Sequence, residues 1–192
     1  FTAGSLNGHT SGNMLLTMLA SYSGSFLEAV HGLGDMLKVR GTVLPVTTGN
    51  ITLRARLEDG TVLIGETAID VPAEQTRPRI AEVWLEPNAM ALPQVSAAIK
   101  VADHVVLGPG DLYTSVIPVL LVRGVAEALR ETRARLIYVC NTMTKPGETD
   151  GFMASQFVSA VERAIGRAVD TVVVNAAVPE SAVAERYATE GS

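Results

Sequence analysis

From residue 92 onward the chain alternates between helix-like and strand-like segments, and this alternation constrains the fold more than any other feature. Short apolar runs rich in β-branched residues predict buried strands, and apolar residues at helical spacing predict helices. Such alternation implies a parallel sheet with right-handed crossovers, so we predict an α/β fold. The expected helices cover 92–102, 112–121, 125–133, 154–165 and 180–187, and the expected strands cover 104–107, 136–140 and 171–174.

The first part of the chain has a different pattern. Two helices are predicted at 14–20 and 26–38, with a cap near Ser11 and a break at residues 23–25. The segment Glu58-Asp59-Gly60 is typical of a hairpin turn between alternating segments. We therefore expect 42–85 to form an antiparallel insertion, which is too short to carry its own core. Its expected strands are 43–46, 51–57, 61–66 and 79–85.

Composition excludes several classes of protein. Of 192 residues, 47% are hydrophobic and 18% charged, which argues against disorder. The net charge of −5 and the scattered basic residues give no footprint for nucleic acid. Cys140 is the one cysteine, so we expect no intramolecular disulfide and interpret Cys140 as a small buried hydrophobe. No apolar run spans a bilayer and no signal peptide is recognisable, which favours the cytoplasm.

The most informative single segment follows the strand expected at 104–107. Gly108 and Gly110 permit a sharp turn and the close approach of a ligand, and Pro109 stiffens the turn. A strand that leads through such a turn into a helix N-terminus offers backbone N–H groups to an anion. The segment therefore predicts a phosphate site or, alternatively, a turn without a ligand, because it matches neither GxGxxG nor the P-loop. The candidate ligand-binding residues of this turn are Gly108, Pro109, Gly110, Asp111, Leu112, Tyr113, Thr114 and Ser115.

Two asparagines follow other predicted strands, at the edge where the carboxyl ends of parallel strands meet. Asn141 and Asn175 can each hydrogen-bond to a base or a sugar hydroxyl. Alternatively, each forms the turn that follows its strand. Both are candidate ligand-binding residues.

The loop 141–151 is long, and long loops are often functional. Thr144, Glu148 and Thr149 supply hydroxyls and a carboxylate. Glu148 or Asp150 could ligate Mg²⁺ beside a phosphate, although we expect Asp150 to cap the helix that follows.

The remaining candidates lie near the ends of the chain. His9 precedes the first helix, where an imidazole can act as acid or base or donate to a phosphate. Tyr187 closes the last predicted helix and can stack on a base, although the sequence by itself favours packing. His31 and His104 lack the spacing of metal ligands, and we interpret both as structural. With no Ser-His-Asp order, HExxH or CxxC, the sequence identifies neither a catalytic residue nor a metal site.

Several segments together match the motifs of a known family. Residues 8–13 resemble GHxxGN, 39–47 resemble VRGxVLPxT, 84–87 resemble a WLxP strand, 108–115 resemble GPGSLYTS and 141–151 resemble NxMTQPGETDG. These motifs stand in the expected order along nearly the whole chain. The chain thus resembles the YvcK-like gluconeogenesis factors of the CofD-like superfamily, which is named for 2-phospho-L-lactate transferase.

The resemblance implies a Rossmann-like, three-layer α/β sandwich with a mostly parallel sheet and a hairpin insertion, forming one domain over 1–192. It implies a cytoplasmic bacterial protein that binds UDP-sugars, notably UDP-N-acetylglucosamine. The implied roles concern cell shape, peptidoglycan synthesis and growth on gluconeogenic carbon sources. No certain cofactor follows, with Mg²⁺ an option, and the expected partners are a second copy of the chain and proteins of cell-wall synthesis. Residues 108–115 would hold the phosphates, Asn13 and Asn141 would line the cleft, and Tyr187 matches a tyrosine implicated in UDP-sugar binding.

The chain departs from the family pattern at two positions in these motifs. Asp111 stands where serine is usual, and Lys145 stands where glutamine is usual. A carboxylate beside a proposed phosphate indicates either a bound cation or a turn that only caps its helix. The family's N-terminal glycine-rich strand and loop and its C-terminal arginine motif do not occur here, so we expect the chain to be a fragment.

Two other functions remain open at this stage. The first is an enzyme like 2-phospho-L-lactate transferase, which joins a phospholactyl group from a guanosine-linked donor to the deazaflavin Fo with the help of Mg²⁺. The second is a scaffold with no ligand. The GPGDLYTS turn favours the regulatory, UDP-sugar-binding reading, because the transferase branch carries a GPSNP-like segment at this place.

Overall fold

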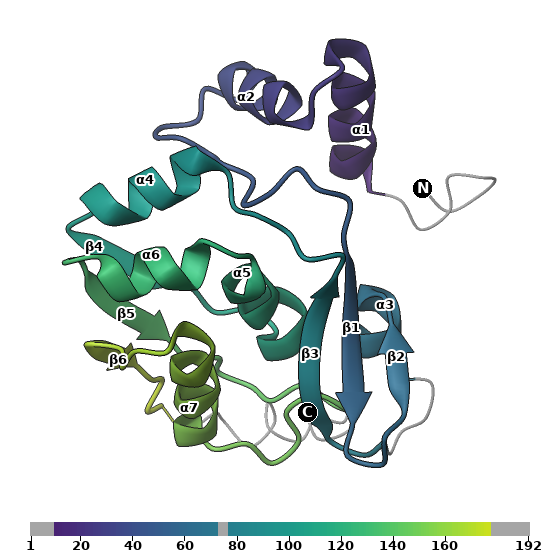
Figure 1. Cartoon of the computed structure of the whole chain (residues 1–192), viewed down its shortest axis with the longest axis vertical. Coiled ribbons are helices and arrows are strands. Elements are labelled where there is room, and N and C mark those ends of the chain that lie inside the picture. Colours follow the sequence, from purple (N-terminus) through teal and green to yellow (C-terminus); the bar gives the residue numbers. More distant parts are fainter. Residues whose placement is uncertain (1–9, 73–76, 178–192) are drawn as a thin grey trace. The chain divides into compact units, whose positions relative to one another are not determined.

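The computed structural model describes residues 10–72 and 77–177, and it confirms the α/β class, with one parallel and one antiparallel sheet (Figure 1). The chain divides into two compact units, residues 1–48 and 49–192. The helix expected at 180–187 lies outside the described residues. In the described part, no helix is both long and apolar enough to cross a membrane.

Two helices make up the described part of the first unit, α1 (Ser11–Ser23) and α2 (Phe26–Met36). Thr10 caps α1, because its hydroxyl accepts a hydrogen bond from Asn13 N (3.3 Å). Gly24 ends α1 in a left-handed conformation (φ 72°), which confirms the predicted break.

The strand predicted at 43–46 is wrong. This segment forms no ladder in the described part of the chain. Pro45 lies in its middle and has no N–H to donate to a partner strand, which favours irregular backbone there.

The antiparallel sheet confirms the predicted hairpin. Its strands β1 (Thr52–Leu57), β2 (Val62–Ile64) and β3 (Ile80–Glu86) lie in the order β2-β1-β3. Between β2 and β3 the chain forms a short helix, α3 (Glu66–Asp70), which the sequence pattern does not predict. This helix places Asp70 at the candidate site described below.

The parallel sheet contains β4 (His104–Leu107), β5 (Arg135–Val139) and β6 (Thr171–Val173), in the order β4-β5-β6. The other helices are α4 (Pro93–Val101), α5 (Ile117–Leu121), α6 (Val125–Glu131) and α7 (Ala154–Ile165), the last with the predicted bounds. Figure 1 shows α5, α6 and α7 grouped beside the parallel strands, with α5 packed against β3.

The core of this unit lies between the parallel sheet and its helices. Leu136 and Tyr138 of β5 are fully buried, as are Val161 and Ile165 of α7. Cys140 is 4% exposed, which confirms its interpretation as a buried residue. The parallel register sets Leu107 beside Tyr138, so the segments that follow β4 and β5 leave the sheet at the same edge.

The helix predicted at 112–121 begins as a π-helical turn, Leu112–Val116, before α5. The carbonyl of Asp111 accepts hydrogen bonds from both Ser115 N (2.9 Å) and Val116 N (3.0 Å). Pro118 has no N–H, and its ring would clash with the carbonyl four residues earlier in a regular α-helix. We attribute the wider turn to this proline.

Candidate functional site

A pocket of about 460 Å³ lies where the segments after β4 and β5 meet. One wall is the glycine turn and the other is the loop that follows β5. The pocket is lined by Pro109, Gly110, Asp111, Asn141, Thr142, Met143, Thr144, Lys145 and Pro146. The structure thus brings together the two segments that the strand-end argument predicted to be neighbours.

The side chain of Asn141 joins the two walls. Its Oδ1 accepts a hydrogen bond from Gly110 N (3.2 Å), and its Nδ2 donates to Gly110 O (2.9 Å). A Cβ atom at Gly110 would lie 3.3 Å from Ser115 Cβ, which is a tight approach that glycine avoids. Asn141 therefore fixes the glycine turn, and its amide is committed to that backbone.

Glu148 lies beneath the turn with a fully buried side chain. Its Oε2 accepts a hydrogen bond from Tyr113 N (3.2 Å), and its Oε1 lies 3.3 Å from the hydroxyl of Thr114. Burial raises the pKa of Glu148 to about 7, against the opposing effects of Tyr113 N–H and of Lys145. The side chain of Glu148 thus occupies the backbone N–H of Tyr113, at the start of the helical turn.

Lys145 reaches into a group of three carboxylates. Its Nζ is 2.6 Å from Asp111 Oδ2 and 3.9 Å from Glu148 Oε1, and it also pairs with Asp70 Oδ1. Burial lowers the pKa of Lys145, but hydrogen bonds to Asp111 and Asp70 outweigh this effect and raise it. Asp70, at the end of α3, is a site residue that was not predicted, since nothing in the sequence places α3 beside the turn.

The loop 141–151 is closed by its own side chains. The hydroxyl of Thr149, a residue 1% exposed, accepts a hydrogen bond from Lys145 N (2.8 Å). Asp150 Oδ2 accepts from Gly147 N (2.6 Å). The prediction that Asp150 caps the following helix is therefore wrong, because α7 starts after Met153, whose N–H donates to Gln156. Asp150 lies too early in the chain to reach the first turn of α7.

Arg77, which the sequence did not point to, connects the loop to helix α3. Its Nε donates to Gly147 O (2.6 Å), and its other nitrogens donate to the carbonyls of Ala68 and Ile69. Desolvation by burial lowers the pKa of Arg77. Gly147 has φ +75°, and a Cβ there would lie 2.8 Å from Pro72 Cγ. In the sequence, only the match of residues 141–151 to a family motif draws attention to Gly147, and nothing there indicates its contact with Arg77.

Other predicted site residues lie elsewhere. Asn175 Oδ1 accepts a hydrogen bond from Ala177 N (3.0 Å), which is the turn-forming alternative, and Asn175 does not line the pocket. Gly108 and Ser115 line a neighbouring pocket of about 310 Å³ with Val106. Leu112 is buried, and Asn13 belongs to the first unit, on α1. His9 and Tyr187 lie outside the described residues.

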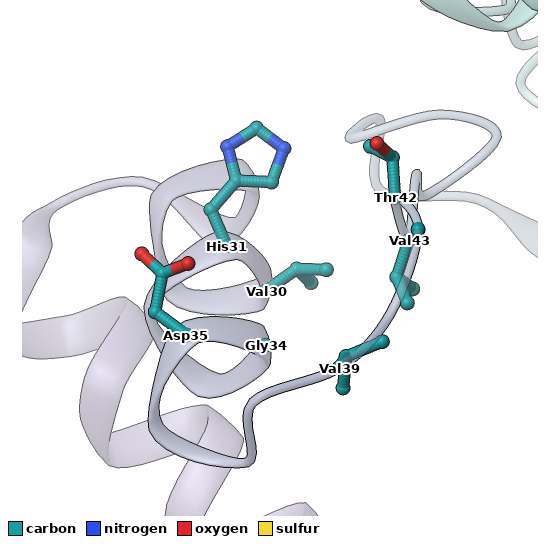
Figure 2. Close-up of a pocket in the computed structure, with 8 residues that line it drawn as sticks. Val30, His31, Gly34, Asp35, Val39, Thr42 and Val43 are labelled. Carbon is teal, nitrogen blue, oxygen red and sulfur yellow. The ribbon is translucent and has the colours of Figure 1, made fainter.

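The first unit has a pocket of its own, of about 330 Å³. Figure 2 shows His31 and Asp35 one turn apart on α2, with Asp35 pointing away from the segment that carries Val39, Thr42 and Val43. The two polar side chains are exposed and come from one helix, so they do not form a convergent site.

Comparison with known proteins gives one consistent family. The family model described as "2-phospho-L-lactate transferase CofD" matches residues 1–192. A Thermotoga maritima protein named "putative gluconeogenesis factor" is 45% identical over 192 residues, which is the whole chain and 60% of that protein. The gluconeogenesis factor of Bacillus subtilis is 36% identical over 97% of this chain and 58% of its own length.

A solved structure has the same fold. The crystal structure of a Bacillus halodurans protein matches with a TM-score of 0.92 and 39% identity, over all of this chain and 61% of that one. The chain thus spans about 60% of the length of these three proteins. With a family match over every residue and a shared fold, the chain belongs to the CofD family, among the proteins named gluconeogenesis factors.

Proposed function

We propose that this chain is the ligand-binding part of a cytoplasmic bacterial regulatory protein, and that its pocket holds the diphosphate of a nucleotide sugar. UDP-N-acetylglucosamine is the first candidate ligand. The observation that carries the proposal is the meeting of the glycine turn and the 141–147 loop around one pocket at the carboxyl ends of β4 and β5. Ligands of α/β sheets bind at this edge, and the volume suits a small-molecule site.

The turn is held in place before any ligand arrives. Asn141 hydrogen-bonds to both the N–H and the carbonyl of Gly110, and Glu148 accepts a hydrogen bond from Tyr113 N. The space beside Gly108 is open, since a Cβ there would meet no heavy atom within 4 Å. A fixed, accessible turn favours binding because little ordering remains to be done when the ligand enters.

The groups at the pocket are better suited to binding than to covalent chemistry. Cys140, the only cysteine, is buried, and burial raises the pKa of its thiol, so it is a poor nucleophile. The pocket instead offers amides, hydroxyls and the paired charges of Lys145 and Asp111. We infer that occupancy of the pocket changes the surface seen by partner proteins of cell-wall synthesis, and that the effects on cell shape and gluconeogenic growth follow from this.

A transferase is the second candidate. It is favoured by the match of the whole chain to a family model described as 2-phospho-L-lactate transferase. That activity would require a guanosine-linked donor, the deazaflavin Fo and Mg²⁺ to neutralise charge on the diphosphate.

Calorimetric titration of the full-length protein distinguishes the candidates. We expect UDP-N-acetylglucosamine to bind and GDP with Mg²⁺ to give no signal. Asn141→Ala should weaken binding of the UDP-sugar at least about tenfold, because two hydrogen bonds that hold the turn are lost. The matched control is Asn175→Ala, which removes the other strand-end asparagine and should leave affinity unchanged. Binding of GDP alone would support the transferase, and silence from both ligands would support a scaffold.

A further inference from the structure

The ammonium group of Lys145 lies within a set of oxygen atoms that resembles a cation site. One carboxylate oxygen from each of Asp70, Asp111 and Glu148 lies within 4.8 Å of the other two. Lys145 Nζ pairs with all three carboxylates and is 2.6 Å from Asp111 Oδ2. The lysine side chain is 27% exposed, so its charge sits at the border between the pocket and the interior.

We next ask whether the oxygen atoms of Asp70, Asp111 and Glu148 fit a divalent cation. Carboxylate oxygens from three chain segments are the ligands that Mg²⁺ and Mn²⁺ prefer. An ammonium group at hydrogen-bond distance from two of these carboxylates occupies their lone pairs and repels a second cation. As the chain stands, the residues do not fit a divalent ion at this position.

Lys145 and Asp111 come from the two segments that form the walls of the pocket. The carboxylate of Asp111 and the ammonium group of Lys145 form a direct ion pair across 34 residues of sequence. Lysine without Asp111 would lose one of its two hydrogen-bonded carboxylates, and Asp111 without the lysine would face two further carboxylates. The charges therefore compensate one another locally, and removal of the lysine alone would leave Asp70, Asp111 and Glu148 without the cation that now pairs with them.

We propose that Lys145 is a built-in cation that takes the place of a divalent metal ion at this site, with Asp111 as its matched partner. Lys145 is a positioning residue, because it joins α3, the glycine turn and the 141–151 loop beneath the pocket. It follows, if the pocket binds the proposed nucleotide sugar, that binding does not depend on Mg²⁺.

Metal binding by the full-length protein tests the proposal without any nucleotide. We would titrate Mn²⁺ and follow free Mn²⁺ by electron paramagnetic resonance. Wild type should show no Mn²⁺ binding at this site, whereas Lys145→Gln should bind one Mn²⁺ per chain, since three carboxylates then lack their cation. Lys100→Gln is the matched control, because Lys100 forms an exposed pair with Glu131 and should not create a site when it is removed.

A double variant keeps the test decisive if Lys145→Gln is unstable. Asp111→Ser with Lys145→Gln removes one carboxylate together with the lysine, so it should be more stable than Lys145→Gln and should bind Mn²⁺ more weakly. Lys145→Arg should keep the site free of metal. The proposal is overturned if wild type binds Mn²⁺ in a manner that Asp111→Asn abolishes, or if Lys145→Gln and Lys100→Gln bind Mn²⁺ equally.

Binding measurements with UDP-N-acetylglucosamine distinguish failure of this proposal from failure of the proposed function. Affinity of wild type for UDP-N-acetylglucosamine should be the same in EDTA and in Mg²⁺, and Lys145→Gln should gain a dependence on Mg²⁺. If no variant binds the UDP-sugar, the proposed function fails while the Mn²⁺ result still decides the role of Lys145. If wild type binds only with Mg²⁺, the proposed function survives and the built-in cation does not.

Discussion

The side-chain amide of Asn141 and the peptide groups of Gly110 bond each other in both directions, across 31 residues of sequence. This pair connects the ends of two neighbouring parallel strands and fixes the glycine turn. Asn141, predicted to bind a ligand directly, instead holds the glycine turn that would bind it.

Replacing Asn141 by alanine should destabilise the fold as well as the turn. Two hydrogen bonds at half-buried groups are lost, so we expect the free energy of unfolding to fall by about 1–3 kcal/mol. Urea unfolding followed by circular dichroism measures the change. Asn175→Ala, at an exposed turn, should change stability by less than about 0.5 kcal/mol. Equal effects of the two substitutions would show that the Asn141 bonds contribute nothing specific.

Two glycines of the same loop should respond differently to alanine. Gly147 and Gly151 both have positive φ, +75° and +66°, so each substitution strains the backbone by about 1 kcal/mol. At Gly147 the new Cβ would also lie 2.8 Å from Pro72 Cγ, whereas at Gly151 it meets nothing within 4 Å. Thermal unfolding should therefore show a clearly larger loss for Gly147→Ala, and similar losses would contradict the close packing at Pro72.

Glu148 should make stability depend on pH. Its pKa is about 7 in the folded protein against the ordinary glutamate value of 4.5, so the folded state keeps a proton that the unfolded chain releases between these values. The free energy of unfolding contributed by this group is thus present below about pH 4.5 and is lost as pH rises to about 7, by up to about 3 kcal/mol.

The glutamine variant isolates this contribution. Glu148→Gln cannot titrate, so the difference in unfolding free energy between wild type and variant should change steadily from pH 4.5 to pH 7 in favour of the variant. Chemical denaturation at several pH values measures it. Parallel curves for the two proteins would mean that the buried carboxyl does not hold its proton.

Arg77 should not be replaceable by lysine. Its guanidinium donates to three backbone carbonyls, those of Gly147, Ala68 and Ile69, and a single ammonium group cannot match this fork. We expect Arg77→Lys to lower the free energy of unfolding by about 1–3 kcal/mol. The exposed Arg133 provides the control, and Arg133→Lys should stay within about 0.5 kcal/mol of wild type.

Much of the architecture could be predicted from the sequence because periodic apolar patterns report which face of an element is buried. Helix α7 (Ala154–Ile165) and strand β4 (His104–Leu107) have the predicted bounds. The expected strand at 43–46 failed because apolar residues alone do not supply a pairing partner, and Pro45 removes a donor. The short α3 was missed because five residues carry too little periodicity to reveal a helix.

The sequence by itself determined the α/β class, the strand-to-turn order that places residues 108–111 and 141–147 at one sheet edge, and the motifs that mark the family. Only the tertiary structure decided which groups meet there. Asp70 and Arg77 reach the site from the antiparallel sheet's connections, and Lys145 pairs with Asp111 across 34 residues. The reason is physical: periodicity records burial, which is local, whereas ion pairs and hydrogen bonds between distant segments depend on how those segments pack.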